Sequence, residues 1–299
     1  MHLRWSILAL VLTLLPQPAG AQVADAQAIA PTLAGTEGSL FHVALEARRL
    51  GDERMASALL ERVVRLDPGA VLPRLELAEA LLVLREPELV EALLLPVAAR
   101  IEAESGTRPD AAARFYRLRG TAAARAGRSG DALDLYERAI EFSPADLGLR
   151  SLVVSMYRTR GDRSAAARHL VAAATLRPED PDLRIEAGHA LLGVARFSDA
   201  ELEFRDALRV DLWAVRAWRG LGESLAGQER WAEAEEVYRG GIRLAPESAE
   251  LHELLGDALL AAGRAKEAVV WYTRASTLPG ANAPVLERKI EQARARLEP

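Results

Sequence analysis

Apolar and small residues recur along the chain with a period of 34 positions, over roughly its C-terminal two-thirds. Within each period, two runs of apolar residues spaced three and four positions apart predict two helices separated by a short break. The aligned positions form five tracks: Gly120, Val154, Gly188, Gly222 and Gly256; Ala132, Ala166, Ala200, Ala234 and Ala268; Tyr136, Leu170, Phe204, Tyr238 and Tyr272; Ala139, Ala173, Ala207, Gly241 and Ala275; and Pro144, Pro178 and Pro246, with Leu212 and Gly280 as exceptions. No single pair of helices can bury its apolar face alone, so the pattern predicts a stack of helical hairpins.

Each track predicts a structural role. Gly127, Gly161 and Gly263 share one phase and suit the left-handed conformation of a tight turn between helices. The prolines cannot continue a preceding helix and therefore separate one hairpin from the next. Small residues in the other tracks predict close approach of two helix backbones, and the aromatic track fills the larger gaps between hairpins.

One period carries a fuller motif: Trp218, Leu221, Gly222, Leu225, Ala234, Tyr238, Gly241 and Pro246. This motif resembles the tetratricopeptide repeat family, and the resemblance covers about four-fifths of the chain. It implies an all-α, right-handed α-α superhelix of about seven hairpins plus a capping helix over 283–299. The hairpins are expected at 37–70, 71–112, 113–146, 147–180, 181–214, 215–248 and 249–282. The second is degenerate, because Pro87 and Pro96 disturb its second helix and residues 105–109 read as a loop.

The first 21 residues predict a cleaved signal peptide. Arg4 precedes an apolar run from Trp5 to Leu15, and Ala19-Gly20-Ala21 is a small-residue cleavage pattern. The apolar run is shorter than the ~20 residues that span a bilayer, so we expect no membrane span in the mature chain. Residues 22–36 are expected to be a flexible leader. The sequence contains no cysteine, which favours the periplasm, with secretion as the second choice.

Composition and motifs indicate no catalytic chemistry. The 38 basic and 43 acidic residues nearly balance, so no bulk charge indicates nucleic-acid binding. The histidines fall at different phases of the repeat, and His252 to Gly256 lacks the second histidine of a zinc-protease helix. We find no nucleophile elbow, phosphate loop or cysteine nucleophile. The sequence therefore predicts neither enzyme activity, metal nor cofactor.

In tetratricopeptide repeats the first helix of each hairpin lines a concave groove, which the resemblance transfers to this chain. A stripe at helical spacing along those helices gives the candidate binding residues. They are Phe41, Leu72, Leu75, Arg114, Arg117, Ser151, Arg158, His189, Arg216, Arg219, Glu250, Glu253 and Asp257, with Arg48, Glu79, Leu82, Ile185 and Glu223 on the same stripe. The predicted groove is apolar at its N-terminal end, basic in the middle and acidic at its C-terminal end.

The interpretation is a non-catalytic scaffold or adaptor that holds a protein or peptide partner of unknown identity in the groove. Envelope assembly, secretion and polysaccharide export are contexts suggested by analogy alone. Two alternatives stay open. The charged residues could simply solvate the helices, or the chain could bind glycans or peptidoglycan through arginines and exposed tryptophans such as Trp213, Trp231 and Trp271. The oligomeric state is not predicted.

Overall fold

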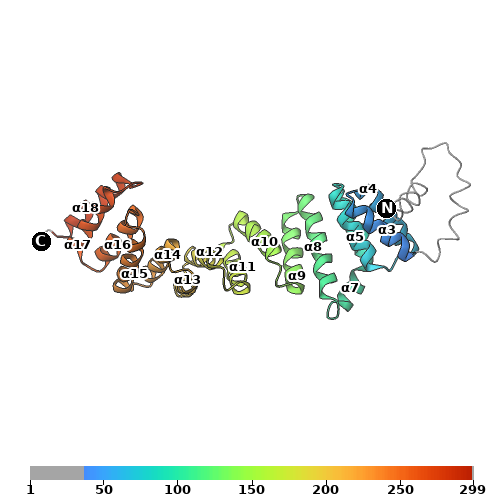
Figure 1. Ribbon diagram of the computed structural model, residues 1–299, viewed down its shortest axis with the longest axis horizontal. Coiled ribbons are helices and arrows are strands. Elements are labelled where there is room, and N and C mark those ends of the chain that lie inside the picture. The colour runs from blue at the N-terminus through green and yellow to red at the C-terminus, as the bar shows by residue number, and fades with distance from the viewer. Residues whose placement is uncertain (1–36, 298–299) are drawn as a thin grey trace, which may run out of the picture. The chain divides into compact units, whose positions relative to one another are not determined.

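The computed structural model describes residues 37–297, and every regular element within that range is helical (Figure 1). The all-α solenoid class expected from the 34-residue period is confirmed. The signal peptide and the leader expected within residues 1–36 lie outside the described residues. The chain divides at Asp146 into two compact units, which we describe separately as unit 1 (37–146) and unit 2 (147–297).

Unit 1 is built from pairs of helices packed side by side, with an irregular second pair. Its elements are α3 (Glu37–Arg49), α4 (Glu53–Leu66), α5 (Val71–Val83), α6 (Pro87–Leu94), the 3-10 turn η2 (Leu95–Val97), α7 (Ala98–Glu104), α8 (Pro109–Arg125) and α9 (Ser129–Phe142). Pro87 stands at the start of α6, where its missing N–H costs nothing. Pro96 lies in η2, and the helix that follows is the short α7. The two prolines thus break the second pair into short segments.

Unit 2 is more regular. Its elements are α10 (Leu147–Arg160), α11 (Arg163–Leu176), α12 (Pro181–Leu192), α13 (Phe197–Val210), α14 (Val215–Gly227), α15 (Trp231–Leu244), α16 (Ala249–Ala261), α17 (Ala265–Ser276) and α18 (Ala283–Ala295). Each helix packs against the next along the chain from α10 to α18. The last of them, α18, packs on α17 without a following partner in the described residues.

The turn inside each hairpin uses one left-handed residue. Positive φ angles occur at Gly51, Arg85, Gly127, Gly161, Ala195, Glu229 and Gly263. The three glycines predicted to take this conformation do so, with φ of 76°, 82° and 80° at Gly127, Gly161 and Gly263. At the same phase, Ala195 and Glu229 adopt φ of 57° and 61° although they carry a Cβ atom. The stack therefore imposes the turn even where the sequence disfavours it.

The tracks meet in the core as pairs of a small residue and a ring. A Cβ atom on Gly120, Gly188, Gly222 or Gly256 would lie 2.2–2.7 Å from the ring of the aromatic residue 16 positions later. Where that ring is replaced by Leu170, the glycine position holds Val154, and the two residues share one buried cluster. The five alanines of the second track are all buried. At this track, glycine is thus required only where a ring packs directly on the helix backbone.

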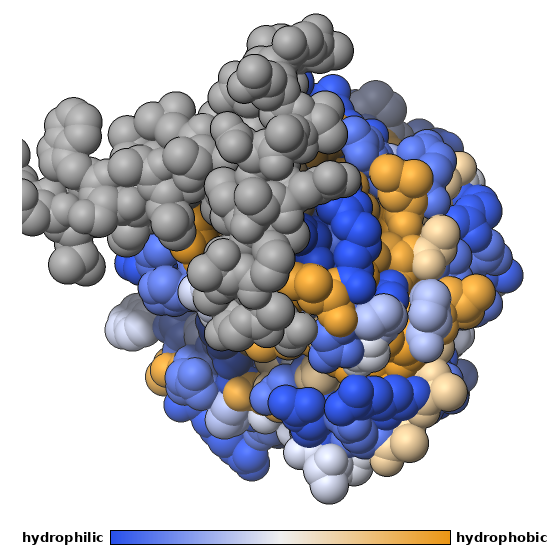
Figure 2. All heavy atoms as spheres, turned by 90° about the vertical axis from the view of Figure 1, so that its right-hand side faces the viewer, coloured by the Kyte–Doolittle hydropathy of each residue, from blue (hydrophilic) through white to orange (hydrophobic). Residues whose placement is uncertain are grey.

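Unit 1 exposes several apolar side chains. Leu50 and Leu72 are 71% and 48% exposed, and Leu66 and Val83 are also exposed. Figure 2 views the right-hand side of Figure 1, where α3 to α5 lie, and apolar surface appears there among hydrophilic residues. Unit 1 therefore carries exposed apolar side chains, of which only Leu72 belongs to the predicted groove.

Candidate functional site

Charged side chains on the first helices of the hairpins form what we call the first-helix face. In unit 1 it comprises Arg48 on α3, Glu76 and Glu79 on α5, and Arg114 and Arg117 on α8; in unit 2 it comprises Arg158, Asp182, Glu186, Arg216, Arg219, Glu223, Glu250, Glu253 and Asp257 on α10, α12, α14 and α16. Within each unit, charges of one helix face opposite charges of the next first helix.

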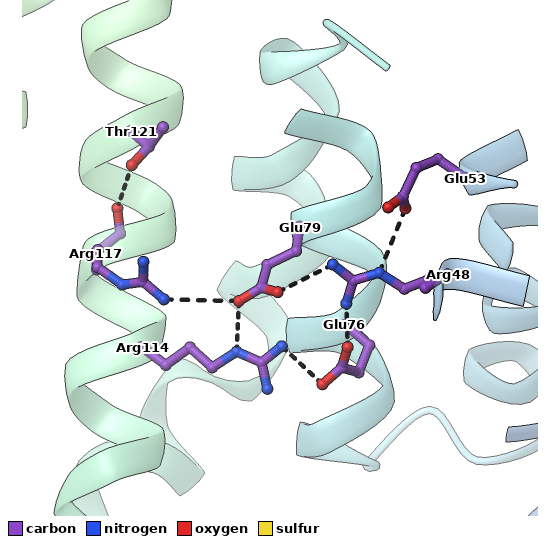
Figure 3. A network of polar contacts seen from close by, with 7 residues as sticks. All are labelled: Arg48, Glu53, Glu76, Glu79, Arg114, Arg117 and Thr121. Atoms are coloured by element: carbon purple, nitrogen blue, oxygen red, sulfur yellow. Dashed lines mark hydrogen bonds and ion pairs between the residues drawn. The ribbon is translucent and has the colours of Figure 1, made fainter. Parts of the chain in front are cut away.

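In unit 1 these charges form one network (Figure 3). Arg114 donates from Nε to Glu79 and from Nη2 to Glu76, each over 2.7 Å. Arg48 reaches the same two carboxylates from the other side and also contacts Glu53. Burial alone would raise the pKa of Glu79, but the ion pairs with Arg114 and Arg48 outweigh it, so its pKa lies below the usual value.

This network changes the meaning of the predicted basic stripe. Arg114 and Arg117 were expected to offer positive charge to a partner. Arg114 is instead occupied by two carboxylates, and the Nη2 atom of Arg117 lies 3.7 Å from Glu79. The network holds three arginines and three glutamates, so it is neutral. We conclude that this part of the face joins α3, α5 and α8 and is not a free basic surface.

The same pairing continues in unit 2. Arg158 lies 2.8 Å from Glu186 on the next first helix, and Arg216 lies 3.7 Å from Asp182. Arg219 donates from Nη1 to Glu250 over 2.8 Å. These pairs are largely exposed, so each contributes little to stability. Their effect is to leave few unpaired charges on the face.

The predicted acidic end is also partly neutralised, because one lysine pairs with two of its carboxylates. Glu253 and Asp257 both contact Lys289, with Nζ–oxygen distances of 2.7 Å. Lys289 comes from α18, which the sequence reading treated only as a solvating cap. The sequence contains only two lysines, so lysines form no repeated charge pattern along it. The approach of α18 to α16 was therefore not predicted from charge.

The apolar candidates are partly misplaced. Phe41 is half-buried and Leu72 is exposed, but Leu75 is 1% exposed and belongs to the core. The outward side of α5 runs through exposed Leu72 and Val83 and half-buried Glu76 and Glu79, whereas the predicted stripe includes the buried residues Leu75 and Leu82. Ile185 is buried for the same reason, with Glu186 in its place on the face. The predicted stripe was placed one residue away from the true one on these helices. Because one residue turns a helix by about 100°, this shift moves Leu75, Leu82 and Ile185 from the face into the core.

The remaining candidates are single side chains. Ser151 is exposed on α10. His189 is half-buried beside the edge of the Phe204 ring, with the ring centroids 5.0 Å apart. Burial, then Arg219 and Arg216, lower the pKa of His189 to about 4, and its Nε2 atom is buried without a hydrogen-bond partner. His189 is therefore neutral near pH 7.

The tryptophans differ in their surroundings. Trp213 is 74% exposed between α13 and α14. Trp271 packs against His252, with the ring centroids 5.5 Å apart, and under the Arg239 guanidinium, 5.1 Å from its ring centroid. Trp231 is half-buried and lines a hollow in unit 2.

That hollow has a volume of about 380 Å³ and lies between α14, α15 and α16. Its lining consists of Glu223, Ala226, Trp231, Tyr238, Leu254, Asp257, Ala258 and Ala261. The sequence reading placed Glu223 and Asp257 on the groove stripe but did not foresee the hollow. Its walls are mostly apolar, and its polar groups come from Glu223, Asp257 and the Tyr238 hydroxyl.

The repeat register explains why the hollow opens here. One period earlier, Gly220 and Gly227 let the α14 backbone lie against aromatic rings: a Cβ atom on them would be 2.2 Å from Phe204 and 2.4 Å from Phe197. Thirty-four positions later the glycines become Leu254 and Ala261. These side chains stand between the α16 backbone and the rings of α15, so a space remains between them.

The described residues show no other site of recognised chemistry. Between residues 37 and 297, no three His, Asp or Glu side chains converge in a way that could hold a metal ion. Nor is any helix of this range both long and apolar enough to cross a bilayer.

Comparison with known proteins agrees with the fold. The tetratricopeptide repeat model matches residues 97–146, 185–249 and 224–282. No curated protein matches the chain in sequence. Among solved structures, the chain is similar to one of Naa15/Naa10 bound to HypK-THB, with 13% identity and a TM-score of 0.67 over 87% of this chain and 39% of that one.

Two smaller structures are also similar. YrrB, described as a tetratricopeptide repeat protein with an unusual peptide-binding site, has 17% identity and a TM-score of 0.48 over 63% of this chain and 96% of its own. MamA has 18% identity and a TM-score of 0.46 over 60% of this chain and 94% of its own. From the family match and the helical stack, we conclude that the chain carries tetratricopeptide repeats and has an all-α solenoid fold.

Proposed function

We propose that the protein is a non-catalytic scaffold that binds a protein partner on the first-helix face of unit 2, with the hollow between α14, α15 and α16 as the anchor point. The observation that carries the proposal is the hollow itself. Its volume of about 380 Å³ falls within the ~300–1,000 Å³ range of ligand pockets. It combines apolar walls with a few polar groups, which is the usual composition of a recognition site.

The repeat architecture supports a macromolecular partner over a small substrate. Stacked repeats present extended surfaces and are typical of protein-interaction modules. The hollow contains no nucleophile paired with a base, because its lining has neither Ser, Cys nor His. Several charges of the face are paired with each other, whereas the hollow offers apolar walls, which makes it a candidate for an anchoring side chain.

The proposal is tested by photo-crosslinking. A benzophenone amino acid at Ala261, which is exposed at the hollow, should crosslink to a partner in the native extract, and the same group at exposed Ala232 on α15 serves as the control. We expect one crosslinked protein at position 261 and none at 232. A folded Ala261 variant with the same crosslinks as the Ala232 control would overturn the proposal.

We further propose that the protein is exported to the periplasm, where envelope assembly, secretion or polysaccharide export are possible settings. The support is the charged start, apolar run and small-residue cleavage pattern of residues 1–21. N-terminal sequencing of the protein from fractionated cells tests this. We expect Gln22 as the first residue in the periplasmic fraction, and an intact Met1 in the cytosol would contradict it.

A glycan-binding role is the second candidate, and it depends on Trp213. An exposed indole is a suitable platform for a sugar ring, and Trp213 is 74% exposed. The arginines that would accompany it are mostly ion-paired, which weakens this reading. Retention on peptidoglycan that is lost in Trp213→Ala and kept in Trp271→Ala would favour the glycan role.

A further inference from the structure

We propose that the hollow of unit 2 receives a lysine side chain of the partner, held by Glu223 and the Tyr238 hydroxyl. The inference rests on the proposed function and names the group that the site recognises. It is carried by an internal precedent: one repeat later, the equivalent site is occupied by a lysine of the chain itself.

That occupied site lies between α16, α17 and α18. The Nζ atom of Lys289 is 2.7 Å from both carboxylate oxygens of Asp257, 2.7 Å from Glu253 and 5.7 Å from the centroid of the Tyr272 ring. The Tyr272 hydroxyl donates to Asp257 over 2.7 Å. An ammonium group is thus held by carboxylates and by the face of an aromatic ring, two interactions that favour cations.

A shift of 34 positions places two of these groups at the hollow and replaces the third, because Glu253 corresponds to Arg219, whose Nε atom lies 3.5 Å from Glu223. Asp257 corresponds to Glu223, and Tyr272 corresponds to Tyr238. The residue that corresponds to Lys289 is Leu255, which is fully buried and brings no charge. The hollow therefore retains one of the two carboxylates and the tyrosine of the lysine site, and the chain brings Arg219 but no lysine to it.

Two polar groups of the hollow, Glu223 and the Tyr238 hydroxyl, make few contacts within residues 37–297. Tyr238 is 1% exposed and lines the hollow, and its hydroxyl has no hydrogen-bond partner among residues 37–297. The repeat-equivalent hydroxyls of Tyr136 and Tyr272 bond to Thr121 and Asp257. Glu223 has one ion-pair contact in the described chain, 3.5 Å from Nε of Arg219. Burial raises the pKa of Glu223, and the Arg219 charge only partly offsets this.

The rest of the lining suits the stem of a lysine. Ala226, Leu254, Ala258 and Ala261 provide apolar surface for four methylene groups. The rings of Trp231 and Tyr238 are close enough to line the same space and can attract the ammonium. A carboxylate side chain would instead meet Glu223 and Asp257, which disfavour it by like-charge repulsion.

The test uses an oriented library of acetylated heptapeptide amides, with three randomised residues on each side of a fixed central position. The centre is Lys, Arg, norleucine, Gln or Glu, and binding is measured to the wild-type chain. We expect the Lys library to bind about tenfold more tightly than the norleucine library, as for one charge-assisted contact. Blocked termini ensure that the selected amine is the side chain.

Two isosteric variants identify the groups. Glu223→Gln should remove the preference for Lys over norleucine, and Tyr238→Phe should reduce it about threefold. Glu236→Gln, an exposed change on α15 outside the hollow, should leave it unchanged. Circular dichroism checks that each variant is folded. If either Glu223→Gln or Tyr238→Phe does not fold, the other variant still provides the test.

The outcomes separate the two proposals. Peptide binding without a preference for lysine, a preference for arginine, or a lysine preference that survives both Glu223→Gln and Tyr238→Phe would overturn the lysine assignment and leave the scaffold role standing. Absence of binding by every library, together with absence of crosslinks at Ala261, would overturn both.

Discussion

Substitution of Gly220 by alanine tests the packing on which the repeat stack and its hollow depend. A Cβ atom at this position would lie 2.2 Å from Cζ of Phe204 and within 2.6 Å of two further ring carbons. Non-bonded carbon atoms need about 3.5 Å, so the ring would have to move by more than about 1 Å. Phe204 is fully buried and also packs against Gly188, which leaves the ring little space.

The expected cost follows from two opposing effects. Overpacking a core by one methyl group costs about 1–3 kcal/mol, and the severe contact places Gly220→Ala near the upper end. Alanine in place of glycine within a helix returns about 1 kcal/mol. We therefore expect a net loss of about 2 kcal/mol in the free energy of unfolding of unit 2, measured by urea denaturation followed by circular dichroism.

A double-mutant cycle shows whether the ring is the cause. Phe204→Leu shortens the side chain that the new methyl group meets, so the combined variant should lose about 1 kcal/mol less than the sum of the single losses. Gly130→Ala on α9 is the matched control, since nothing lies within 4 Å of its Cβ position, and it should be neutral or slightly stabilising. A stable Gly220→Ala protein, or additive single losses, would refute the packing argument.

Four further substitutions test other features of the described chain. Lys289→Met leaves Glu253 and Asp257 facing each other without a cation. We expect the free energy of unfolding to fall by about 1–2 kcal/mol and amide exchange in α18 to become faster. The control Lys266→Met, on the exposed surface of α17, should change neither. Glu79→Gln leaves three arginines, Arg48, Arg114 and Arg117, with only two carboxylates, Glu76 and Glu53. It should lower the free energy of unfolding of unit 1 by about 1–3 kcal/mol, whereas the exposed control Glu61→Gln should lower it by less than about 0.5 kcal/mol. Glu229→Gly relieves a positive φ and should stabilise by up to about 1 kcal/mol, while Glu236→Gly within α15 should cost about the same. The pKa of His189 falls to about 4 on folding, so the unfolded chain takes up the His189 proton first as pH drops below about 6.5. The free energy of unfolding should therefore fall between pH 6.5 and 4 by about 2 kcal/mol more in the wild type than in His189→Leu. Equal losses in the two proteins would contradict the pKa shift.

The sequence was sufficient for the fold because its period records packing directly. The glycine track was expected where helix backbones approach closely and the aromatic track in the gaps between hairpins, whereas each glycine of that track faces a ring of its own hairpin. Even the exception was informative, since Val154 coincides with Leu170, the position without a ring. Contacts between the two helices of one hairpin depend on the spacing of residues within that hairpin, and this spacing can be read directly from the sequence.

The face was harder to predict because its chemistry depends on pairs between hairpins. Arg114 was visible as a basic residue on the stripe, but the bond to Glu79 joins side chains 35 positions apart. One period of 34 plus one residue is a spacing that could have suggested this pair. Lys289 lies 32 positions from Asp257, which is also close to the period, but the pair depends on the position of α18 on α16. Leu75 failed for a different reason, since one residue of phase separates the face from the core.

Repeats also provide their own comparison, and departures from the repeat are where function is best sought. Phe204 and Tyr238 occupy one track, yet Phe204 packs against Gly220 while Tyr238 meets Leu254 and a hollow. For fold stability alone, glycine would serve equally well at position 254 as at position 220, because the α16 backbone would then cover the Tyr238 ring. The chain instead keeps a buried tyrosine that lines a hollow together with Glu223, and its hydroxyl makes no hydrogen bond within residues 37–297. One repeat later, the tyrosine hydroxyl donates to Asp257 and Lys289 pairs with that carboxylate, and this contrast is why we assign the hollow to a cation supplied from outside.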